Sequence, residues 1–484
     1  MKKSILFILI FLNLEFINTS FANPAGEDPS SYVDSVVSVF RGSTNSAVIV
    51  GVIKMQPEGP METWKYTYGH LKRDTLTSPP VNDSTLFQIG SITKTFNATL
   101  LSMLVNRGLI SLYDTVQNYL PDSIHVPVYI SGNDTLVIRF IDLATHYSGL
   151  PDEPPIGSGG MTTYKQMYDY LATYKLTYPP GECYNYSDLG FALLGVALQT
   201  ILNSSIELLI PEYVCDTLSM YDSKIIGLTS GQMSRRAQGY FEGGGEAPFL
   251  MPSWPAYHGA GGLYSTLNDL LKYMKFTMRI DNSNLQNVAD TLFRQRLVTN
   301  DSCQMPNSID SVGLAWQFAK LFPLNPENHI RSISKDGSTS GFASFICFST
   351  HPQTGVKTGV VLVTNWKNPT PVHSLAFNIL KFMNEQGSVG IQNNTQLTGY
   401  ELNQNYPNPF NPKTLISYSI PKPEIVSIRI YDALGNLSAT LINKKQNGGS
   451  YSIEWNGENF ASGLYYYKIT AGKFVQTRRM VLIK

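Results

Sequence analysis

The sequence carries no excess of charge of either sign. Its 484 residues include 36 Lys and Arg residues and 36 Asp and Glu residues, with no long run of one sign. Proteins that bind nucleic acids or anionic membranes usually present basic patches, so neither partner is indicated. Charged residues account for only 15% of the chain and hydrophobic residues for 43%, a balance typical of a folded protein with a large core.

Long apolar runs are equally scarce. The one exception, "SILFILIFLNL", follows Lys2 and Lys3 and precedes a small-x-small pattern at Ser20 and Ala22. This arrangement predicts a signal peptide over residues 1–22, with cleavage after Ala22. The run is too short for a bilayer span of about 20 residues. We therefore expect no stable membrane anchor and a soluble mature protein, exported through the periplasm to the cell surface or the medium.

The chain also has few cysteines. The four residues allow three full pairings, and the sequence leaves the pairing open. Their wide spacing matches no zinc motif, so no metal site is predicted. Cys347 lies in the apolar run "FASFICF", which favours a buried thiol. The four are Cys183, Cys215, Cys303 and Cys347.

The C-terminal part lacks the residues that catalysis usually needs. Residues 400–484 contain no cysteine, no histidine and no clustered carboxylates. Short alternating runs such as "VSIRIYD" and "YSIEWN", separated by Gly, Asn and Pro, predict an all-β sandwich here. The polar residues 387–399 show no regular period and are predicted to be a linker.

Residues 23–386 show strand patterns at both ends and helical patterns between them. They predict a mixed α/β fold: an antiparallel sheet built from the N- and C-terminal segments, with flanking helices and a mainly helical insert. The helices are expected over 32–40, 97–110, 188–202, 266–278 and 372–385, and the strands over 46–55, 64–71, 312–321, 329–337, 342–349 and 357–366.

The stretch "FQIGSITKTF" places Ser91 three residues before Lys94, on one face of a predicted helix. One interpretation is a serine that caps the helix, followed by a surface charge. The other is a serine nucleophile with a lysine base. A free lysine, with a pKa of about 10.4, is a poor base at neutral pH, so the second interpretation requires burial and a second cation nearby.

Two later segments contain suitable partners. In "CYNYSDLG", Tyr186 stands just before a helical run and could become anionic or relay protons; alternatively it packs a loop. In "KDGSTSG", Lys335 ends a strand pattern and would be the second cation; alternatively it is a surface lysine in a turn. No G-x-S-x-G elbow with matched Asp and His is apparent, which disfavours an α/β-hydrolase.

Taken together, S-x-x-K, a Y-x-N-like segment and K-x-G in this order resemble the serine β-lactamase and penicillin-binding-protein superfamily. "LATHYSGLP", "AGGLYSTLNDLLKY" and "SGFASFICF" extend the resemblance over about residues 32–385. It is closest to the class C β-lactamase-like branch, which includes D-aminopeptidases, D-Ala-D-Ala carboxypeptidases and esterases. This resemblance implies a β-lactamase/transpeptidase-like fold and no metal or organic cofactor.

The resemblance also implies roles for individual residues. Ser91 would be the acylated nucleophile, Lys94 its base or proton relay, and Tyr186 a second proton carrier. Lys335 would hold the site positive and attract a substrate carboxylate. The backbone N–H groups of Ser91 and of Ser338, the residue after Gly337, would form the oxyanion hole. His146 in "THYSGLP" would be a hydrogen-bonded loop residue rather than a general base.

Three positions leave alternatives. Asp188 stands where the resemblance expects Asn, and its carboxylate would offset the charge of Lys94 and Lys335 and raise the lysine and tyrosine pKa values. "SDL" could instead be an altered S-D-N motif with Ser187 as proton carrier, although we prefer Tyr186. A literal K-T-G begins at Lys357, but its context after the turn "HPQTG" favours Lys335.

The C-terminal segments "LNQNYPNPFNPKTLISYSIP" and "WNGENFASGLYYYKITAG" resemble the sorting domain of type IX secretion substrates. This implies the outer-membrane secretion machinery as a partner; the alternative is an ordinary adhesion module. We therefore predict a secreted serine hydrolase that cleaves a small amide or ester through an acyl-enzyme on Ser91. Its substrate would be a D-amino-acid peptide, a peptidoglycan fragment or a short ester. The alternatives are a true β-lactamase or a non-catalytic binding protein that retains the fold.

Overall fold

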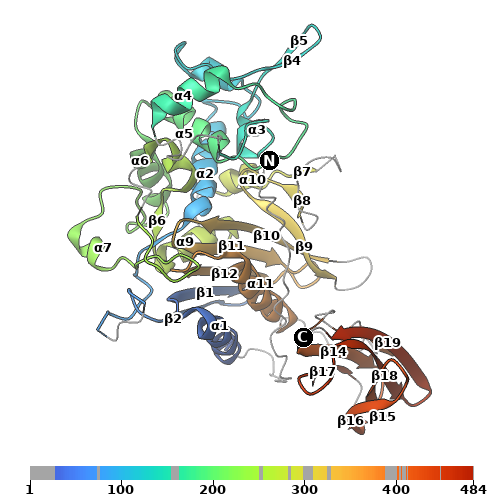
Figure 1. Ribbon diagram of the computed structural model, residues 1–484. Coiled ribbons are helices and arrows are strands. Elements are labelled where there is room, and N and C mark those ends of the chain that lie inside the picture. The colour runs from blue at the N-terminus through green and yellow to red at the C-terminus, as the bar shows by residue number, and fades with distance from the viewer. Residues whose placement is uncertain are drawn as a thin grey trace. The chain divides into compact units, whose positions relative to one another are not determined.

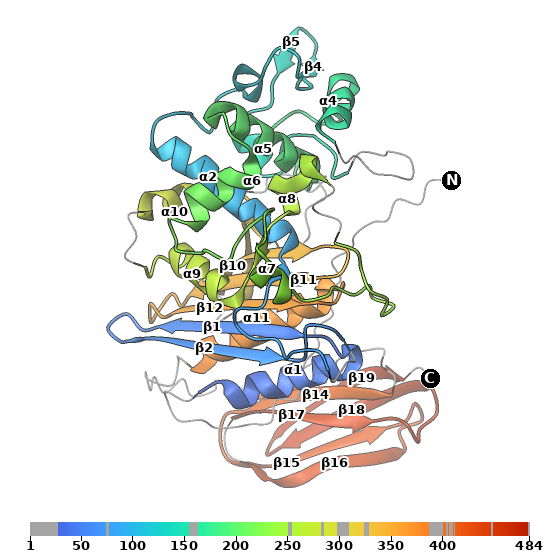
Figure 2. The same cartoon turned by 90° about the vertical axis from the view of Figure 1, so that its left-hand side faces the viewer.

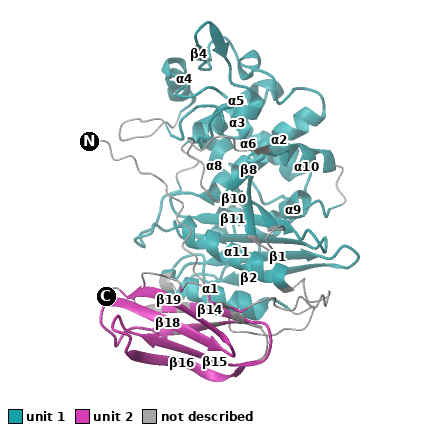
Figure 3. Cartoon of the chain, turned by 90° about the vertical axis from the view of Figure 1, so that its right-hand side faces the viewer, with its two compact units in different colours: residues 1–16, 23–388 teal, residues 17–22, 389–484 magenta. Residues whose placement is uncertain are grey.

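The computed structural model describes residues 28–73, 77–153, 163–249, 254–281, 285–297, 309–323, 329–386, 400–402, 405, 410, 412–446 and 449–482. The signal peptide predicted over 1–22 and the linker predicted over 387–399 lie outside these residues. The described residues up to 386 form one compact unit, and those from 400 form a second (Figure 3).

The first unit is built on one eight-stranded antiparallel sheet with the order β2-β1-β12-β11-β10-β9-β8-β7. The N-terminal hairpin thus lies in the same sheet as strands that follow some 230 residues later in the chain, which confirms the predicted mixed α/β fold. The strands are β1 Val48–Met55, β2 Met61–Tyr68, β7 Arg296–Leu297, β8 Ile309–Val312, β9 Gln317–Pro323, β10 His329–Ser338, β11 Ala343–Thr350 and β12 Lys357–Thr364.

Helices cover both faces of this sheet, which explains why β1 is apolar almost throughout. Side chains alternate between the faces of a strand. Val48, Val50 and Val52 pack with helices α1 (Ser30–Thr44) and α11 (Pro369–Gln386). Ile49 and Ile53 belong to the larger core formed with the helical insert. Figures 1 and 2 show α1 on one side of the sheet and the insert on the other.

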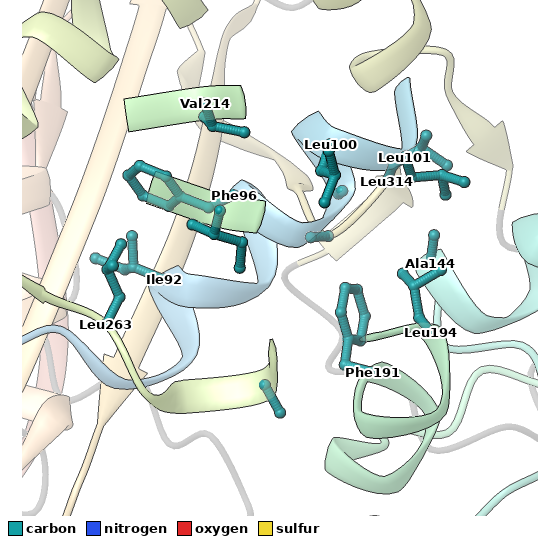
Figure 4. Packing of buried hydrophobic residues seen from close by; sticks show 14 of the residues in the cluster. Ile92, Phe96, Leu100, Leu101, Ala144, Phe191, Leu194, Val214, Leu263 and Leu314 are labelled. Carbon is teal, nitrogen blue, oxygen red and sulfur yellow. The ribbon is translucent and has the colours of Figure 1, made fainter. Parts of the chain in front are cut away.

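The insert is mainly helical, as predicted. Helix α2 is its central element, and Figure 4 shows Phe96 and Leu101 of α2 among apolar side chains from several other segments. The helices are α2 Thr93–Asn106, α3 Phe140–Ala144, α4 Tyr164–Thr173, α5 Asp188–Leu202, α6 Ile206–Leu209, α7 Ser230–Ser234, α8 His258–Gly261, α9 Leu267–Thr277 and α10 Gln286–Leu292, with shorter turns η1 Gly90–Ile92, η2 Val116–Tyr119, η3 Ile210–Cys215 and η5 Pro255–Tyr257.

The strand predicted over 312–321 is wrong in one respect. The chain turns after β8, where Gly313 N donates to Trp316 O at 2.8 Å, and β9 then returns beside β8. The apolar run continues through the turn because Leu314, Ala315 and Trp316 are buried, so hydrophobicity alone does not mark it. Two short pairings were also not predicted: β3 Phe87–Gln88 with β6 Tyr264–Ser265, and β4 Tyr129–Ser131 with β5 Asp134–Leu136.

The second unit contains two antiparallel sheets, β13-β14-β17 and β16-β15-β18-β19. Alternate residues of both sheets, including Ile416 and Ile428, share one buried core, which gives the all-β sandwich. The sequence missed β16, whose side chains are half-buried or exposed. The strands are β13 Glu401–Leu402, β14 Lys413–Ile420, β15 Glu424–Tyr431, β16 Leu437–Gln446, β17 Gly449–Asn456, β18 Gly463–Ala471 and β19 Phe474–Leu482.

Of the cysteines, Cys347 is a buried free thiol, as predicted, and Cys215 is another. Cys183 is in a disulfide. Within the described ranges no single helix has the length and apolarity to cross a membrane, although the bent pair Asp188–Leu202 and Ile206–Cys215 passes the same test on length and composition.

Candidate active site

Ser91 and Lys94 lie on one continuous helical segment, because the turn η1 runs directly into α2. Lys94 is fully buried, so the interpretation of a surface charge is wrong. Ser91 is not the cap either: the residue before the turn is Ile89, which makes no side-chain capping bond. Instead the two side chains meet, with Lys94 Nζ donating to Ser91 Oγ at 3.0 Å.

Lys94 has two further partners. Its Nζ lies 2.5 Å from Asp188 Oδ1 and donates to the carbonyl oxygen of Ala260, on α8, at 2.8 Å. Burial lowers the pKa of Lys94, as does the positive charge of Lys335, whereas Asp188 acts in the opposite direction. The net effect is a lysine that gives up its proton more readily than an exposed one.

The ring of Tyr186 lies close to both lysines. Lys94 Nζ is 5.1 Å and Lys335 Nζ 5.0 Å from the ring centre, and the phenol hydrogen bonds to Ser91. Burial and the charge of Asp188 raise the pKa of Tyr186 well above its ordinary value. The phenol therefore stays protonated at neutral pH, which favours a proton relay over an anionic tyrosine.

The loop before α5 holds Tyr186 in place. The imidazole of His146 stacks on Tyr186 at 4.3 Å between ring centres, and its Nδ1 accepts a hydrogen bond from Ser187 N at 3.0 Å. Ser187 caps α5, because its Oγ accepts from Gly190 N at 2.8 Å and donates to Pro151 O at 2.6 Å. Ser187 Oγ makes both of these bonds to groups other than the lysines, which disfavours Ser187 as the proton carrier in place of Tyr186.

Asn97, one turn beyond Lys94, fixes the neighbouring helices against α2. Its buried Nδ2 donates to Phe191 O on α5 at 3.2 Å and to Gly259 O on α8 at 3.1 Å. These bonds hold the two elements that supply Asp188 and Ala260 to Lys94. The sequence offered no signal for this role beyond a polar residue in an apolar helix.

Strand β10 closes the site next to η1, and two glycines make this possible. A Cβ on Gly90, whose φ is +51°, would lie 2.6 Å from Ser338 N, and one on Gly337 would overlap the carbonyl oxygen of Ile89. Ser344 Oγ donates to that same oxygen at 2.8 Å. Close packing of this kind places the backbone of Ser338 beside the backbone that carries Ser91.

Two carboxylates near the lysines were not singled out from the sequence. Asp336 Oδ1 lies 2.8 Å from the Nζ of fully buried Lys335. Asp152 Oδ1 accepts from Asp188 N at 3.1 Å. Loss of water around its carboxylate, together with the charge of Asp188, raises the pKa of Asp152 to about 7. Asp336 was visible within "KDG", but a local sequence does not show that its side chain turns toward Lys335.

Lys357 lies away from this site. It begins β12, and its Nζ donates to Met278 O at 2.9 Å and Arg279 O at 3.2 Å, just beyond the C-terminus of α9. Gly359 faces the same helix, where a Cβ would overlap the sulfur of Met274. The structure thus brings together Ser91, Lys94, Tyr186, Asp188 and the segment Lys335–Ser338, and leaves the literal K-T-G outside.

Comparison with protein families agrees with this architecture. Residues 60–382 match the model of the beta-lactamase family, which is more than half of the chain. The chain therefore belongs to the beta-lactamase family, and this membership indicates a serine hydrolase that acts on amides or esters. Residues 404–484 match the secretion system C-terminal sorting domain, which indicates export to the medium or cell surface and interaction with the secretion machinery.

Individual relatives cover most of the first unit. The D-alanyl-D-alanine-carboxypeptidase/endopeptidase AmpH of Escherichia coli (strain K12) is 28% identical over 385 residues, or 76% of this chain and 94% of that protein. A beta-lactamase of Yersinia enterocolitica is 25% identical over 65% of this chain and 82% of its own. A solved class C beta-lactamase structure has a TM-score of 0.60 and 24% identity, covering 74% and 98%, and shows the shared fold.

Proposed function

We propose that this protein is a secreted serine hydrolase that forms an acyl-enzyme on Ser91 and cleaves a small amide or ester. The substrate would be a D-amino-acid peptide, a peptidoglycan fragment or a short ester. The observation that carries the proposal is the contact between Ser91 Oγ and buried Lys94, with the protonated phenol of Tyr186 on the same serine. A serine needs an adjacent base to become a nucleophile at neutral pH.

Lys94 suits the role of that base because burial lowers its pKa and its Nζ lies 3.0 Å from Ser91 Oγ. The protonated amine donates to Ser91 Oγ and to Ala260 O, and once it has released a proton its lone pair can accept the proton of Ser91. In acylation, Ser91 Oγ bonds to the substrate carbonyl carbon and its proton passes to Lys94. Asp188 then stabilises the ammonium that forms.

Tyr186 would carry the proton to the leaving group. As the bond from the carbonyl carbon to the leaving nitrogen or oxygen breaks, the phenol donates its proton to that atom and recovers one from Lys94. Water then attacks the acyl-enzyme, and one of its protons returns to Ser91 Oγ through the same groups. The negative charge on the carbonyl oxygen would be held by the N–H groups of Ser91 and Ser338, where loss of one donor typically costs about 10²–10³ in rate.

A true β-lactamase is the second candidate, supported by the curated beta-lactamases among the relatives. Asp188 is the residue that distinguishes this candidate function from the proposed peptidase or esterase. Its carboxylate only accepts hydrogen bonds and is already paired with Lys94, so it cannot offer a substrate amide the donor that an asparagine would supply. This disfavours β-lactam recognition more than hydrolysis itself.

A substrate panel tests the proposal. Purified full-length protein is assayed with D-amino-acid peptides, β-lactams and short esters, beside Ser91→Ala and, as a control, Ser38→Ala, an exposed serine on α1. We expect turnover of at least one peptide or ester, a loss of at least about 10³-fold in Ser91→Ala and no change in Ser38→Ala. Turnover of β-lactams alone would favour the second candidate, and equal activity of Ser91→Ala would refute an acyl-enzyme on this serine.

A further inference from the structure

The positive charge that lines the site on the β10 side already has a partner within the protein. Lys335 is fully buried, and its Nζ lies 2.8 Å from Asp336 Oδ1, which is one-third exposed. Neighbouring residues of a strand normally point to opposite faces. Asp336 can reach Lys335 because the pairing of β9 with β10 ends at Ser334, which leaves the following edge of β10 unpaired by β9.

Asp336 is ionised at neutral pH. Burial opposes its ionisation, but Lys335 and His373 lower the pKa of Asp336 below its ordinary value. His373 Nε2 is 4.0 Å from the other carboxylate oxygen. The carboxylate of Asp336 and the ammonium of Lys335 therefore form an ion pair, and Lys335 Nζ lies 5.0 Å from the ring centre of Tyr186, the proposed proton donor to the leaving group.

Among the described residues, carboxylates also lie close to the other lysine of the site. Lys94 is paired with Asp188. Asp152 and Glu153 lie close enough to Asp188 to respond to its charge. Loss of water around each carboxylate, and then the charge of Asp188, raises the pKa of both, whereas the charge of Lys367 lowers the pKa of Glu153. An incoming carboxylate would thus meet two ammonium groups that each have a carboxylate within 3 Å, with two further carboxylates nearby, so little net attraction repays the loss of its hydration.

We propose that Asp336 makes this site select substrates whose leaving group bears no carboxylate, so that the group released is uncharged or carries an amine. This inference rests on the proposed acyl-enzyme function, and it specifies the substrate class. Asp336 acts through Lys335 and is a positioning residue: it occupies the ammonium that would otherwise bind an anionic leaving group. Its neutral counterpart, Asp336→Asn, keeps the shape and a hydrogen-bonding oxygen but removes the charge.

Two esters that differ only in charge provide the test. N-acetyl-D-alanyl esters of 3-hydroxybenzamide and of 3-hydroxybenzoate have leaving groups of the same size, one neutral and one anionic. For the full-length wild type, we expect kcat/KM to be about ten- to a hundredfold higher for the neutral ester after correction for spontaneous hydrolysis. In Asp336→Asn the ratio should fall to about one or reverse, and raising the salt concentration should weaken the wild-type preference.

Controls separate this proposal from a simple structural defect. Asp336→Ser is measured alongside, and Asp83→Asn removes a partly exposed carboxylate that pairs with Lys65 at 2.9 Å elsewhere. Asp83→Asn should keep the wild-type ratio. Faster hydrolysis of the anionic ester by the wild type, or an unchanged ratio in both folded Asp336 variants, would overturn the proposal while leaving the proposed function intact. Failure of the wild type to hydrolyse either ester or acylate Ser91 would overturn the proposed function, and this inference with it.

Discussion

Lys335 and Lys357 each begin a lysine-x-glycine sequence in the same antiparallel sheet, yet their surroundings differ in every respect that matters for chemistry. Lys335 is fully buried, lies 5.0 Å from the ring centre of Tyr186 and is paired with a carboxylate. Lys357 is partly exposed and donates to two carbonyl oxygens beyond the end of α9. A cation at a helix C-terminus stabilises the helix, whereas a buried cation beside a tyrosine and a second lysine alters proton affinities.

The difference arises from the strand ends rather than from the three-residue pattern. β10 ends against η1, where Gly337 and Gly90 allow the two backbones to approach. β12 begins at its lysine, which pairs with Met55 of β1 and Thr350 of β11, and Gly359 of this strand faces α9. The same lysine-x-glycine pattern therefore provides a candidate site residue in β10 and a helix-capping lysine in β12.

The largest expected effect tests the difference between Lys335 and Lys357 directly. Replacing Lys335 by Ala should lower kcat/KM for an ester substrate about 10²–10³-fold, because it removes the second cation next to Lys94 and Tyr186. Lys357→Ala should retain kcat/KM within about threefold. Steady-state kinetics on the two folded variants measures this, and the reverse result would identify Lys357 as the functional lysine.

Tyr186 sharpens the comparison, because its ring contacts Lys335 and not Lys357. Tyr186→Phe keeps the ring but removes the relay proton, and we expect about a 10²-fold loss of kcat. Tyr184→Phe is the matched control, since Tyr184 is a buried neighbour whose hydroxyl bonds to Gln317. Equal losses in both variants would indicate a packing defect instead of a relay.

Stability should respond in the opposite order. Lys357→Met removes a charged donor from two carbonyl oxygens, and we expect the free energy of unfolding to fall by about 1 kcal/mol. The double variant Lys335→Met with Asp336→Leu replaces the whole ion pair with apolar side chains, so the free energy of unfolding should be unchanged or higher. Urea denaturation compares the variants, and greater destabilisation in the double variant would contradict a site held at a cost to the fold.

The smallest effect concerns Asp152. Its folded-state pKa of about 7 lies above the ordinary value of 3.8, so the native state binds more protons between these values and stability is lost as pH rises through this window. Asp152→Asn should lack that loss. Because Asp152 is exposed, we expect the gain in the variant to stay below about 1 kcal/mol between pH 4.5 and 7.5. If the free energy of unfolding of the wild type and of Asp152→Asn changed with pH by the same amount across this range, the raised pKa would be contradicted.

Much of the fold could be predicted, because the hydrophobic period of a segment indicates a helix or a strand and the order of the segments along the chain indicates how the sheet is built. Helix α5 matches its predicted range, and β10, β11 and β12 fall within a few residues of theirs. The turn inside 312–321 could not, because its residues are as apolar as the strands beside it. Ser91, Lys94, Tyr186 and Lys335 were singled out by motif. Asp336 and Asp152 were not, since no motif indicates that Asp336 turns toward its neighbour Lys335 or that Asp152 meets Asp188 of another segment.

Covalent labelling of Ser91 tests the central claim most directly. The full-length protein is incubated with a fluorophosphonate probe, which phosphonylates activated serines with release of fluoride, and its intact mass is measured beside Ser91→Ala. We predict one probe mass on the wild type, located at Ser91 by peptide mapping, and none on the variant. A well-folded wild type that stays unlabelled, or a label that persists in Ser91→Ala, would contradict the account.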